Sequence, residues 1–275
     1  MFITIINDSR DQNAFGRQAT RAAGLFGCGV ATVGVADDLE AAGNLVDVLD
    51  AAEGREGVVL VNVAPRQEHG KKSEKGSVGF VGTEVAKKEN GSPFGFFYYG
   101  KTLVVSSIDG ATLSLVKKLG IADKIHVLDI AATGKAMVEK GVIDEAISER
   151  MRTTQFRSYE FLPRVAQWIV NREPVVSTER LLLAADAPKA IWWVDSFGNA
   201  KTTLLPDDVS FIEGKEVQML LGSLPCFTSL KDVPDGVAAI TIGSSGIGDK
   251  RFLEIFVQGE SAAERFHLVS GSMVV

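Results

Sequence analysis

Cysteine and histidine are scarce in this chain, which has two cysteines and three histidines among its 275 residues. Cys28 and Cys226 lie far apart in the sequence, so neither a disulfide framework nor a cysteine-rich zinc site has support, and we expect both as small buried apolar residues. The three histidines form no short-range pair, which argues against a histidine metal site. We therefore expect no bound metal.

Basic residues are also in the minority, with 29 lysines and arginines against 35 aspartates and glutamates and a formal net charge of −6. The positive surplus that neutralises phosphates in a nucleic-acid-binding protein is missing. No apolar run is long enough to cross a bilayer, and residues 1–11 lack the basic start and small-residue cleavage site of a signal peptide. With 45% hydrophobic and 23% charged residues, the composition predicts a folded, cytoplasmic protein with no nucleic-acid or membrane partner.

Short β-branched runs alternate with stretches of helical period along the first two-thirds of the chain, which is typical of a sheet covered by helices. The pattern predicts strands at residues 3–6, 30–35, 57–63, 78–81, 94–99, 102–105 and 124–129. It predicts helices at residues 10–26, 37–53, 111–119, 131–140 and 158–170. We expect an α/β half built on a mostly parallel, Rossmann-like sheet, with Asp37 as N-cap of the second helix.

From about residue 189 the pattern changes to strands separated by turns, with one short helical candidate at residues 261–266. This change predicts two domains, an α/β domain at residues 1–172 and a smaller β-rich domain at residues 179–275. The polar, proline-containing segment 171–178 (NREPVVST) is the expected linker.

Two segments that resemble ligand-binding motifs have ordinary structural interpretations. The glycines of GLFGCG (residues 24–29) follow a helix and precede a strand, the reverse of the order in a dinucleotide-binding motif, so we interpret them as a helix stop. Residues 65–76 are polar and basic and are expected to form an exposed loop. His69 and Lys71 in this loop could contact a phosphate, although such side chains are usually only solvated.

Two acidic residues follow apolar strands, and each has two open interpretations. Asp8 comes at the carboxyl end of the first strand, where α/β sheets bind ligands, and a carboxylate there can chelate a ribose diol or cap the following helix. The segment from Val194 to Asn199 (VDSFGN) offers an acid, an aromatic ring and an amide, which can hold an ammonium group and a flat ring. The same residue types also make an ordinary tight turn.

Taken together, these segments resemble the S-adenosyl-L-methionine hydroxide adenosyltransferases, a family that shares its fold with the fluorinases and chlorinases. VDSFGNAKTT (residues 194–203) is similar to the family's acid-x-Phe-Gly-Asn-x-x-Thr segment, and IGSSG (242–246) with LEIFVQGESAA (253–263) is similar to its Ser-Ser-Gly and Leu-Glu-Ile blocks. ITIINDSRDQNAF (3–15) resembles the family's first strand and acidic turn. TTQFRSYEFLPRVAQWI (153–169) resembles the end of its first domain.

The resemblance implies a fold, an assembly and a substrate. The fold is an α/β N-terminal domain followed by a β-barrel-like C-terminal domain. The assembly is a homotrimer with the ligand between the N-terminal domain of one subunit and the C-terminal domain of the next. S-adenosylmethionine is the substrate, and no cofactor is needed.

The resemblance also implies roles for individual residues. Asp8 holds the ribose hydroxyls, and Asp195 with Ser244 or Ser245 holds the amino-acid part of the substrate, since a carboxylate matches the ammonium and a hydroxyl the carboxylate. The residues that bracket the adenine are Phe197, Asn199, Phe227 and the backbone near Val257 and Gly259. Asn13 and Phe15 occupy substrate-side positions where the family has a second acid and a polar or aromatic residue.

The sequence departs from the family where the nucleophile is activated. Hydroxide-transferring members use an Asp-Pro-Gly loop, a following arginine and a Phe-His-Gly segment to polarise a water. Here Ala64, Lys71 and Arg157 stand at those positions, so the activating acid and histidine are absent. Phe156 and Ser158 match the Phe-Tyr-Ser segment of the halide users, but Ala64 and Arg157 do not match their aromatic and tyrosine residues.

Attack at a ribose carbon next to a sulfonium needs little acid catalysis, because neutral methionine is the leaving group. We therefore favour cleavage of S-adenosylmethionine by water to adenosine and methionine, with Arg157, Ser158 and Lys71 nearest the nucleophile. One alternative is a halide or another small anion as nucleophile, since an arginine holds an anion well. A second alternative is a binding protein that has lost the chemistry. A third is a changed ligand, since Asn13 removes a negative charge that would favour the methionine ammonium.

Overall fold

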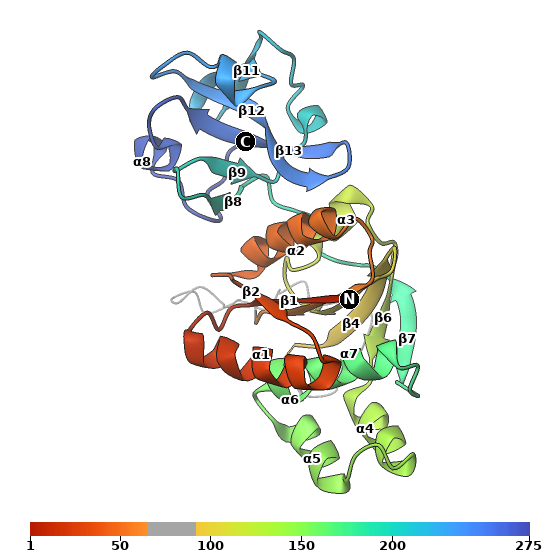
Figure 1. Cartoon of the computed structure of the whole chain (residues 1–275). Coiled ribbons are helices and arrows are strands. Elements are labelled where there is room, and N and C mark those ends of the chain that lie inside the picture. The colour runs from red at the N-terminus through yellow and green to blue at the C-terminus, as the bar shows by residue number, and fades with distance from the viewer. Residues whose placement is uncertain (65–91) are drawn as a thin grey trace, which may run out of the picture. The chain divides into compact units, whose positions relative to one another are not determined.

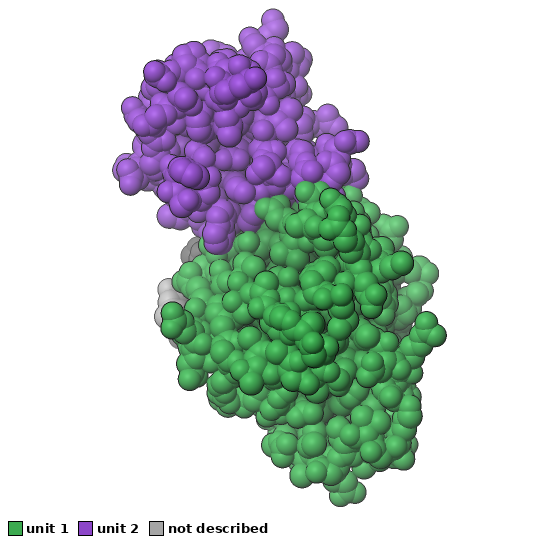
Figure 2. Space-filling view, viewed as in Figure 1, with its two compact units in different colours: residues 1–185 green, residues 186–275 purple. Residues whose placement is uncertain are grey.

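The computed structural model describes residues 1–64 and 92–275, which form two compact units, residues 1–185 and 186–275 (Figure 2). The fold is mixed α/β with two multi-stranded sheets, one in each unit. The predicted strand at residues 78–81 and the residues His69 and Lys71 lie outside the described ranges. None of the helices in the described ranges combines the length and apolar character needed to cross a bilayer.

The first unit is built on a seven-stranded sheet in the order β2-β1-β3-β5-β4-β6-β7. Its strands are β1 (Phe2–Asn7), β2 (Val30–Gly34), β3 (Gly57–Asn62), β4 (Phe94–Tyr99), β5 (Thr102–Ser107), β6 (Lys124–Leu128) and β7 (Ser177–Leu181). The β2-β1-β3-β5 half is parallel, as expected. In the other half, the pairs β5–β4, β4–β6 and β6–β7 are antiparallel. Strands β4 and β5 must be antiparallel, because only two residues, including Gly100, connect them.

Helices cover both faces of this sheet (Figure 1). They are α1 (Gln12–Phe26), α2 (Asp38–Ala52), α3 (Ser114–Leu119), α4 (Ile130–Glu139), α5 (Glu145–Thr153), α6 (Arg157–Glu160) and α7 (Leu162–Val170). Helices α1 and α7 lie on one face and α2 and α3 on the other (Figure 1). The central strand β3 is therefore buried on both sides, and Val58, Val59 and Val61 are each fully buried, each contributing about 1.5–3 kcal/mol.

The predicted N-cap of α2 and the predicted end of α1 are confirmed, whereas α1 begins at Gln12 rather than at residue 10. Asp37 accepts hydrogen bonds from the backbone nitrogens of Leu39 (3.0 Å) and Glu40 (2.8 Å) and is the N-cap of α2. Helix α1 ends at Gly27, whose φ of +68° is the left-handed conformation of a helix C-cap, so GLFGCG is a helix stop. Helix α5 was not predicted from the sequence, because Met151 is its one buried residue and its apolar pattern is weak.

The predicted helix at 158–170 is divided into α6 and α7, and Pro163 lies in the first turn of α7. A proline lacks the N–H that an uninterrupted helix would need, while it is well tolerated in a first turn. The break places Arg157 as the first residue of the short helix α6.

The unit boundary lies later than the predicted linker. Strand β7 (Ser177–Leu181) pairs antiparallel with β6, with Glu179 opposite His126, so residues 179–185 belong to the first unit rather than to the second. The sequence pattern does not reveal this strand, because β7 is an exposed edge strand made mainly of polar residues.

The second unit is built on a six-stranded sheet in the order β10-β11-β12-β13-β9-β8. Its strands are β8 (Ile191–Val194), β9 (Ala200–Thr202), β10 (Glu216–Met219), β11 (Gly222–Phe227), β12 (Ala238–Ile247) and β13 (Lys250–Val257), followed by the helix α8 (Ala262–Phe266). An apolar cluster that includes Ile191, Cys226 and Ile255 forms its core. The barrel-like closure implied by the family resemblance is not observed, since within residues 186–275 the edge strands β10 and β8 do not pair.

Candidate functional site

The first group of candidate residues lies at the carboxyl ends of β1, β3 and β5. Asn7, the last residue of β1, is fully buried, and its Nδ2 donates a hydrogen bond to Oε1 of Gln18 on α1 at 2.7 Å. Its Oδ1 accepts from the backbone nitrogen of Ser9 at 2.8 Å and from Nδ2 of Asn62 at 3.5 Å. Asn7 thus fixes the direction in which the chain leaves the sheet toward Asp8, a role that no local sequence pattern indicates.

Asp8 lies immediately beyond this network and is half-buried. Its backbone nitrogen donates to the carbonyl of Asn62 at 3.4 Å, and its Oδ2 accepts from the backbone nitrogen of Ala64 at 3.2 Å. The N-cap of α1 is Asp11, whose carboxylate accepts from the nitrogen of Ala14 at 2.9 Å. The capping interpretation of Asp8 is therefore wrong, and its carboxylate is instead held between the ends of β1 and β3.

Ser107 connects the third of these strands to the same edge. The Oγ atom of Ser107, which is the last residue of β5, accepts a hydrogen bond from the backbone nitrogen of Val63 at 3.2 Å. The carboxyl ends of β1, β3 and β5 are thus joined by side chains as well as by the sheet. This is the edge at which parallel α/β sheets bind ligands.

Arg157 and Ser158 lie at the start of α6, after the exposed ring of Phe156. The Arg157 side chain is 9% exposed, and its Nη1 donates to the backbone carbonyl of Ser92 at 2.9 Å. Burying a guanidinium is costly unless its N–H groups find acceptors, so this bond positions Arg157 in the fold. Ser158 is half-buried beside it in the chain.

Helix α6 is attached to α1 by arginine and aromatic side chains. The Arg17 guanidinium carbon lies 4.2 Å from the ring centre of Tyr159 and 5.9 Å from that of Phe156. One turn further along α1, Nη1 of Arg21 lies 3.4 Å from Oε2 of Glu160. These contacts fix α6, and with it Arg157, against the helix that follows Asp8.

The other two predicted residues of the first unit lie in the first turns of α1. Asn13 is exposed. The ring of Phe15 packs over the end of β2. Its Cε2 atom would lie 3.4 Å from a Cβ atom added at Gly34. Nothing in the described contacts assigns either residue to a ligand.

In the second unit, Asp195 organises a tight turn between β8 and β9. Its Oδ1 accepts from the backbone nitrogens of Phe197 (2.8 Å) and Asn199 (2.9 Å), and its Oδ2 accepts from Nδ2 of Asn199 at 3.0 Å. Gly198 has a φ of +82°, and an added Cβ atom would meet Oγ of Ser261 at 2.1 Å, so glycine is required there. The turn interpretation is confirmed, and the turn presents the Phe197 ring to solvent at 79% exposure.

The two serines of the Ser-Ser-Gly segment have different environments. Ser245 is 3% exposed, and its Oγ accepts a hydrogen bond from Nζ of Lys201 at 2.9 Å. Ser244 is exposed, and its carbonyl accepts from Nη1 of Arg251 at 3.0 Å. Both serines lie where the register of the β12–β13 pairing shifts, between Ile242 and Gly246, and successive residues of a strand face opposite sides of the sheet.

The remaining predicted adenine contacts are spread over the end of β11 and the end of β13. Phe227 is half-buried at the end of β11, while the side chain of Val257 is buried in the core of the unit. The carbonyl of Val257 accepts from the nitrogen of Glu260 at 3.3 Å, in a turn where Gly259 has a φ of +78°. In residues 1–64 and 92–275, no three His, Cys, Asp or Glu side chains come close enough together to hold a metal ion.

No family model matches this chain, and no curated protein matches it. Solved structures do share its fold over nearly the whole length. An uncharacterized conserved protein from Thermotoga maritima superposes with a TM-score of 0.64 at 15% identity, covering 99% of this chain and 98% of that one. A conserved hypothetical protein from Thermus thermophilus gives a TM-score of 0.55 at 20% identity, covering 100% and 99%. At these identities the likeness concerns the fold alone.

Proposed function

We propose that this protein binds S-adenosylmethionine and cleaves it with water to adenosine and methionine. The observation that carries the proposal is the carboxylate of Asp8 at the carboxyl end of β1, where it is oriented by the backbone nitrogen of Ala64 at 3.2 Å. A carboxylate at this edge of a parallel sheet is suited to accept hydrogen bonds from a ribose diol. The sequence blocks that resemble the adenosyltransferase family support the same substrate.

The proposed reaction makes modest demands on the protein. The oxygen of water forms a bond to C5′ of the ribose, the bond from C5′ to sulfur breaks, and its electron pair stays on sulfur to give the neutral thioether of methionine. The proton lost by water passes to solvent. Alignment and partial desolvation of the nucleophile are therefore the main contributions needed.

Arg157, Ser158 and Lys71 are the residues that we assign to the nucleophile in this proposal. The Arg157 guanidinium is buried and anchored on Ser92. Because it is permanently charged, it favours hydroxide or another anion over neutral water. That charge specifically supports the variant of the proposal in which a halide or another small anion attacks C5′.

The second unit supplies the remaining contacts in the proposal. The exposed ring of Phe197 is available to stack on the adenine. Asn199 and Phe227 are assigned to the same adenine, and Ser244 to the methionine carboxylate. As the resemblance implies, we propose that the protein acts as a homotrimer, which light scattering of the purified protein would test. We also propose that the first unit has a Rossmann-like fold.

A second candidate function is adenosyl-ligand binding without chemistry. It is favoured by Asp195, since both of its carboxylate oxygens accept hydrogen bonds from within their own turn, which reduces their capacity to hold a methionine ammonium. In this case the protein binds adenosine or S-adenosylmethionine and releases it unchanged.

The deciding experiment incubates the purified protein with S-adenosylmethionine in chloride-containing and chloride-free buffer and identifies the products by liquid chromatography and mass spectrometry. Adenosine in both buffers, above a protein-free control, supports water as nucleophile. A halogenated adenosine formed only with chloride supports the halide variant. If the substrate stays unchanged at stoichiometric protein, both the water and the halide reactions are overturned. Binding of adenosine, measured by calorimetry, would then support the second candidate function, a binding protein without chemistry.

A further inference from the structure

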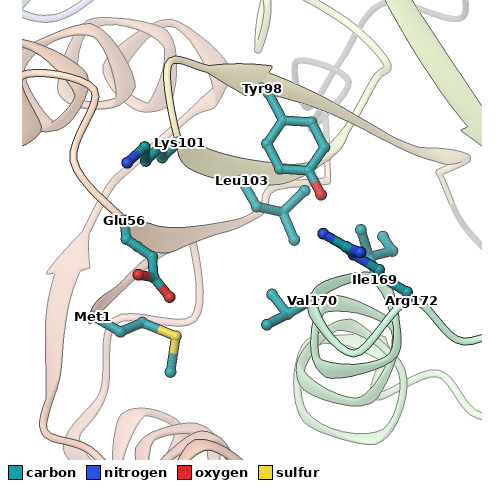
Figure 3. Close-up of a pocket in the computed structure, with 9 residues that line it drawn as sticks. Met1, Glu56, Tyr98, Lys101, Leu103, Ile169, Val170 and Arg172 are labelled. Carbon is teal, nitrogen blue, oxygen red and sulfur yellow. The ribbon is translucent and has the colours of Figure 1, made fainter.

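A pocket of about 210 Å³ opens at the amino-terminal ends of β1, β3 and β5, the opposite end of these strands from Asp8 (Figure 3). The side chains that matter for its chemistry are Glu56, Tyr98, Lys101, Leu103, Val170 and Arg172. They come from the start of β3, the β4–β5 hairpin and the end of α7. All lie in the first unit.

The pocket combines an apolar floor with unneutralised positive charge. Figure 3 shows the Arg172 guanidinium and the Tyr98 hydroxyl turned toward one another, with Leu103 and Val170 beside them and Lys101 and Glu56 farther across the pocket. In the described parts of the chain, the side chains of these three charged residues form no hydrogen bond or ion pair. Two cations against one carboxylate leave a net charge of about +1.

The backbone at Arg172 has a defined conformation, from which the side chain extends into the pocket. Arg172 has a φ of +58°, a left-handed conformation that side chains other than those of Gly, Asn and Asp rarely adopt. Its nitrogen donates to the carbonyl of Ile169 at 3.1 Å, and the nitrogen of Glu173 donates to the carbonyl of Trp168 at 2.8 Å. The adjacent acid, Glu173, pairs with Lys140 instead of with Arg172.

Tyr98 lies at the rim of the pocket, where its side chain is 50% exposed and can offer a hydrogen bond to an anion. Partial burial raises the pKa of Tyr98, and the nearby charge of Arg172 opposes that rise, so the phenol is protonated and able to donate a hydrogen bond at neutral pH. A guanidinium and a hydroxyl directed at one point are the donors that a carboxylate accepts well. The volume is smaller than that of sites for drug-sized ligands, which restricts the occupant to a small molecule.

We propose that this pocket binds a small organic anion, a carboxylate with a short apolar body. The carboxylate lies between the Arg172 guanidinium and the Tyr98 hydroxyl, and the apolar body packs on Leu103 and Val170. Lys101 adds longer-range attraction. The proposal is independent of the adenosyl chemistry assigned to the other end of the strands.

The test uses hexanoate as the probe, hexanamide as its uncharged counterpart and inorganic phosphate as an anion without an apolar body. Binding is followed by amide chemical shifts in ¹H–¹⁵N spectra of the full chain. We expect saturable binding of hexanoate with shifts at Tyr98, Leu103 and Val170, and much weaker binding of the other two. Absence of saturation at ~10 mM hexanoate, or equal binding of hexanamide or phosphate, overturns the proposal.

Three variants locate the site. Arg172→Asn removes the guanidinium while keeping a residue that tolerates the left-handed backbone, and we expect it to weaken hexanoate binding about tenfold or more. Tyr98→Phe removes only the hydroxyl and serves as the independent variant if the first one folds poorly. Lys135→Gln changes an exposed lysine on α4, paired with Glu139, and is the control with unchanged affinity. Unchanged affinity in a folded Arg172→Asn or Tyr98→Phe protein contradicts the proposed pose.

Discussion

The backbone nitrogen of Ala64 donates a hydrogen bond to Oδ2 of Asp8 at 3.2 Å, across the gap between the ends of β3 and β1. This bond means that Asp8 has a structural partner as well as a proposed ligand. Asparagine at this position can still accept from Ala64 through its Oδ1, but it lacks the negative charge that strengthens bonds to ribose hydroxyls.

For this reason we expect Asp8→Asn to weaken binding of S-adenosylmethionine by about 10- to 100-fold, with little change in the midpoint of thermal unfolding. Isothermal titration calorimetry measures the affinity and circular dichroism the midpoint. Asp11→Asn is the matched control, because asparagine caps α1 as well as aspartate does and Asp11 has no proposed ligand role. Equal affinities of the wild type and Asp8→Asn would remove Asp8 from the proposed site.

The buried amide pair at the end of β1 makes a separate prediction about stability. Asn7 and Gln18 are 0% and 2% exposed and share a hydrogen bond of 2.7 Å. Asn7→Ala leaves the Gln18 oxygen buried without its donor, so we expect a loss of about 1–3 kcal/mol in the free energy of unfolding. Urea denaturation measures it, with Gln12→Ala, an exposed amide at the start of α1, as the control.

A double-mutant cycle identifies the cause of that loss. If the hydrogen bond is responsible, Asn7→Leu combined with Gln18→Leu costs less than the sum of the two single changes, because no buried amide then remains unsatisfied. Strict additivity of the two losses would show that the pair is not coupled.

The parts of the fold that could be predicted are those in which burial or a helix end requires particular residue types at neighbouring positions in the sequence. Strand β3 is apolar along its length because helices cover both of its faces, and Asp37 and Gly27 are the residue types that helix ends require. Strand β7 has no such pattern, since it lies exposed at the edge of the sheet, and the sequence prediction divides its residues between the linker (171–178) and the second domain. The antiparallel half of the first sheet likewise depends on tertiary pairing that no local run of residues encodes.

The candidate site also contains residues that could be predicted from the sequence and residues that could not. Asp8 could be found because a polar residue directly after an apolar strand has a defined place in a parallel sheet. Asn7 could not, since its importance comes from contacts with Gln18 and Asn62, which are 11 and 55 positions away. The pocket at the opposite end combines Tyr98 with Arg172, two residues that no motif connects.

The turn at Asp195 leads to a prediction that separates structure from ligand binding. Asp195→Ala removes the acceptor of three hydrogen bonds, so the amides of Phe197 and Asn199 lose their protection whether or not a ligand is present. We expect their hydrogen exchange to accelerate by about tenfold or more, as measured by ¹H–¹⁵N spectroscopy. Asp235→Ala, an exposed acid in the same unit, should leave both rates unchanged. Unaltered exchange in Asp195→Ala would mean that the turn does not depend on this carboxylate.

The exposed pair that joins β7 to β6 predicts a pH dependence. Nζ of Lys124 donates to Oε1 of Glu179 at 2.7 Å, and this bond, together with the charge of Lys124, lowers the pKa of Glu179, with a smaller contribution in the same direction from His126. Because the pKa of Glu179 is lower in the folded state than in the unfolded state, the stabilisation is present above the unfolded pKa and is lost as the pH falls through the folded one. We therefore expect the amides of β7 to exchange faster, relative to those of β3, once the pH falls below about 4.

Glu179→Gln should remove this pH dependence, because the substituted side chain does not titrate, while Glu139→Gln on α4 should leave it in place. Added salt at neutral pH should weaken the protection of β7 in the wild type, since both partners are solvent-exposed and their attraction is screened. Persistence of the pH dependence in Glu179→Gln would assign it to another acid. Since β7 is the last strand of the first unit and pairs with β6 at the edge of the sheet, we expect the Lys124–Glu179 pair to add a small, pH-dependent contribution to the backbone pairing that keeps that edge closed.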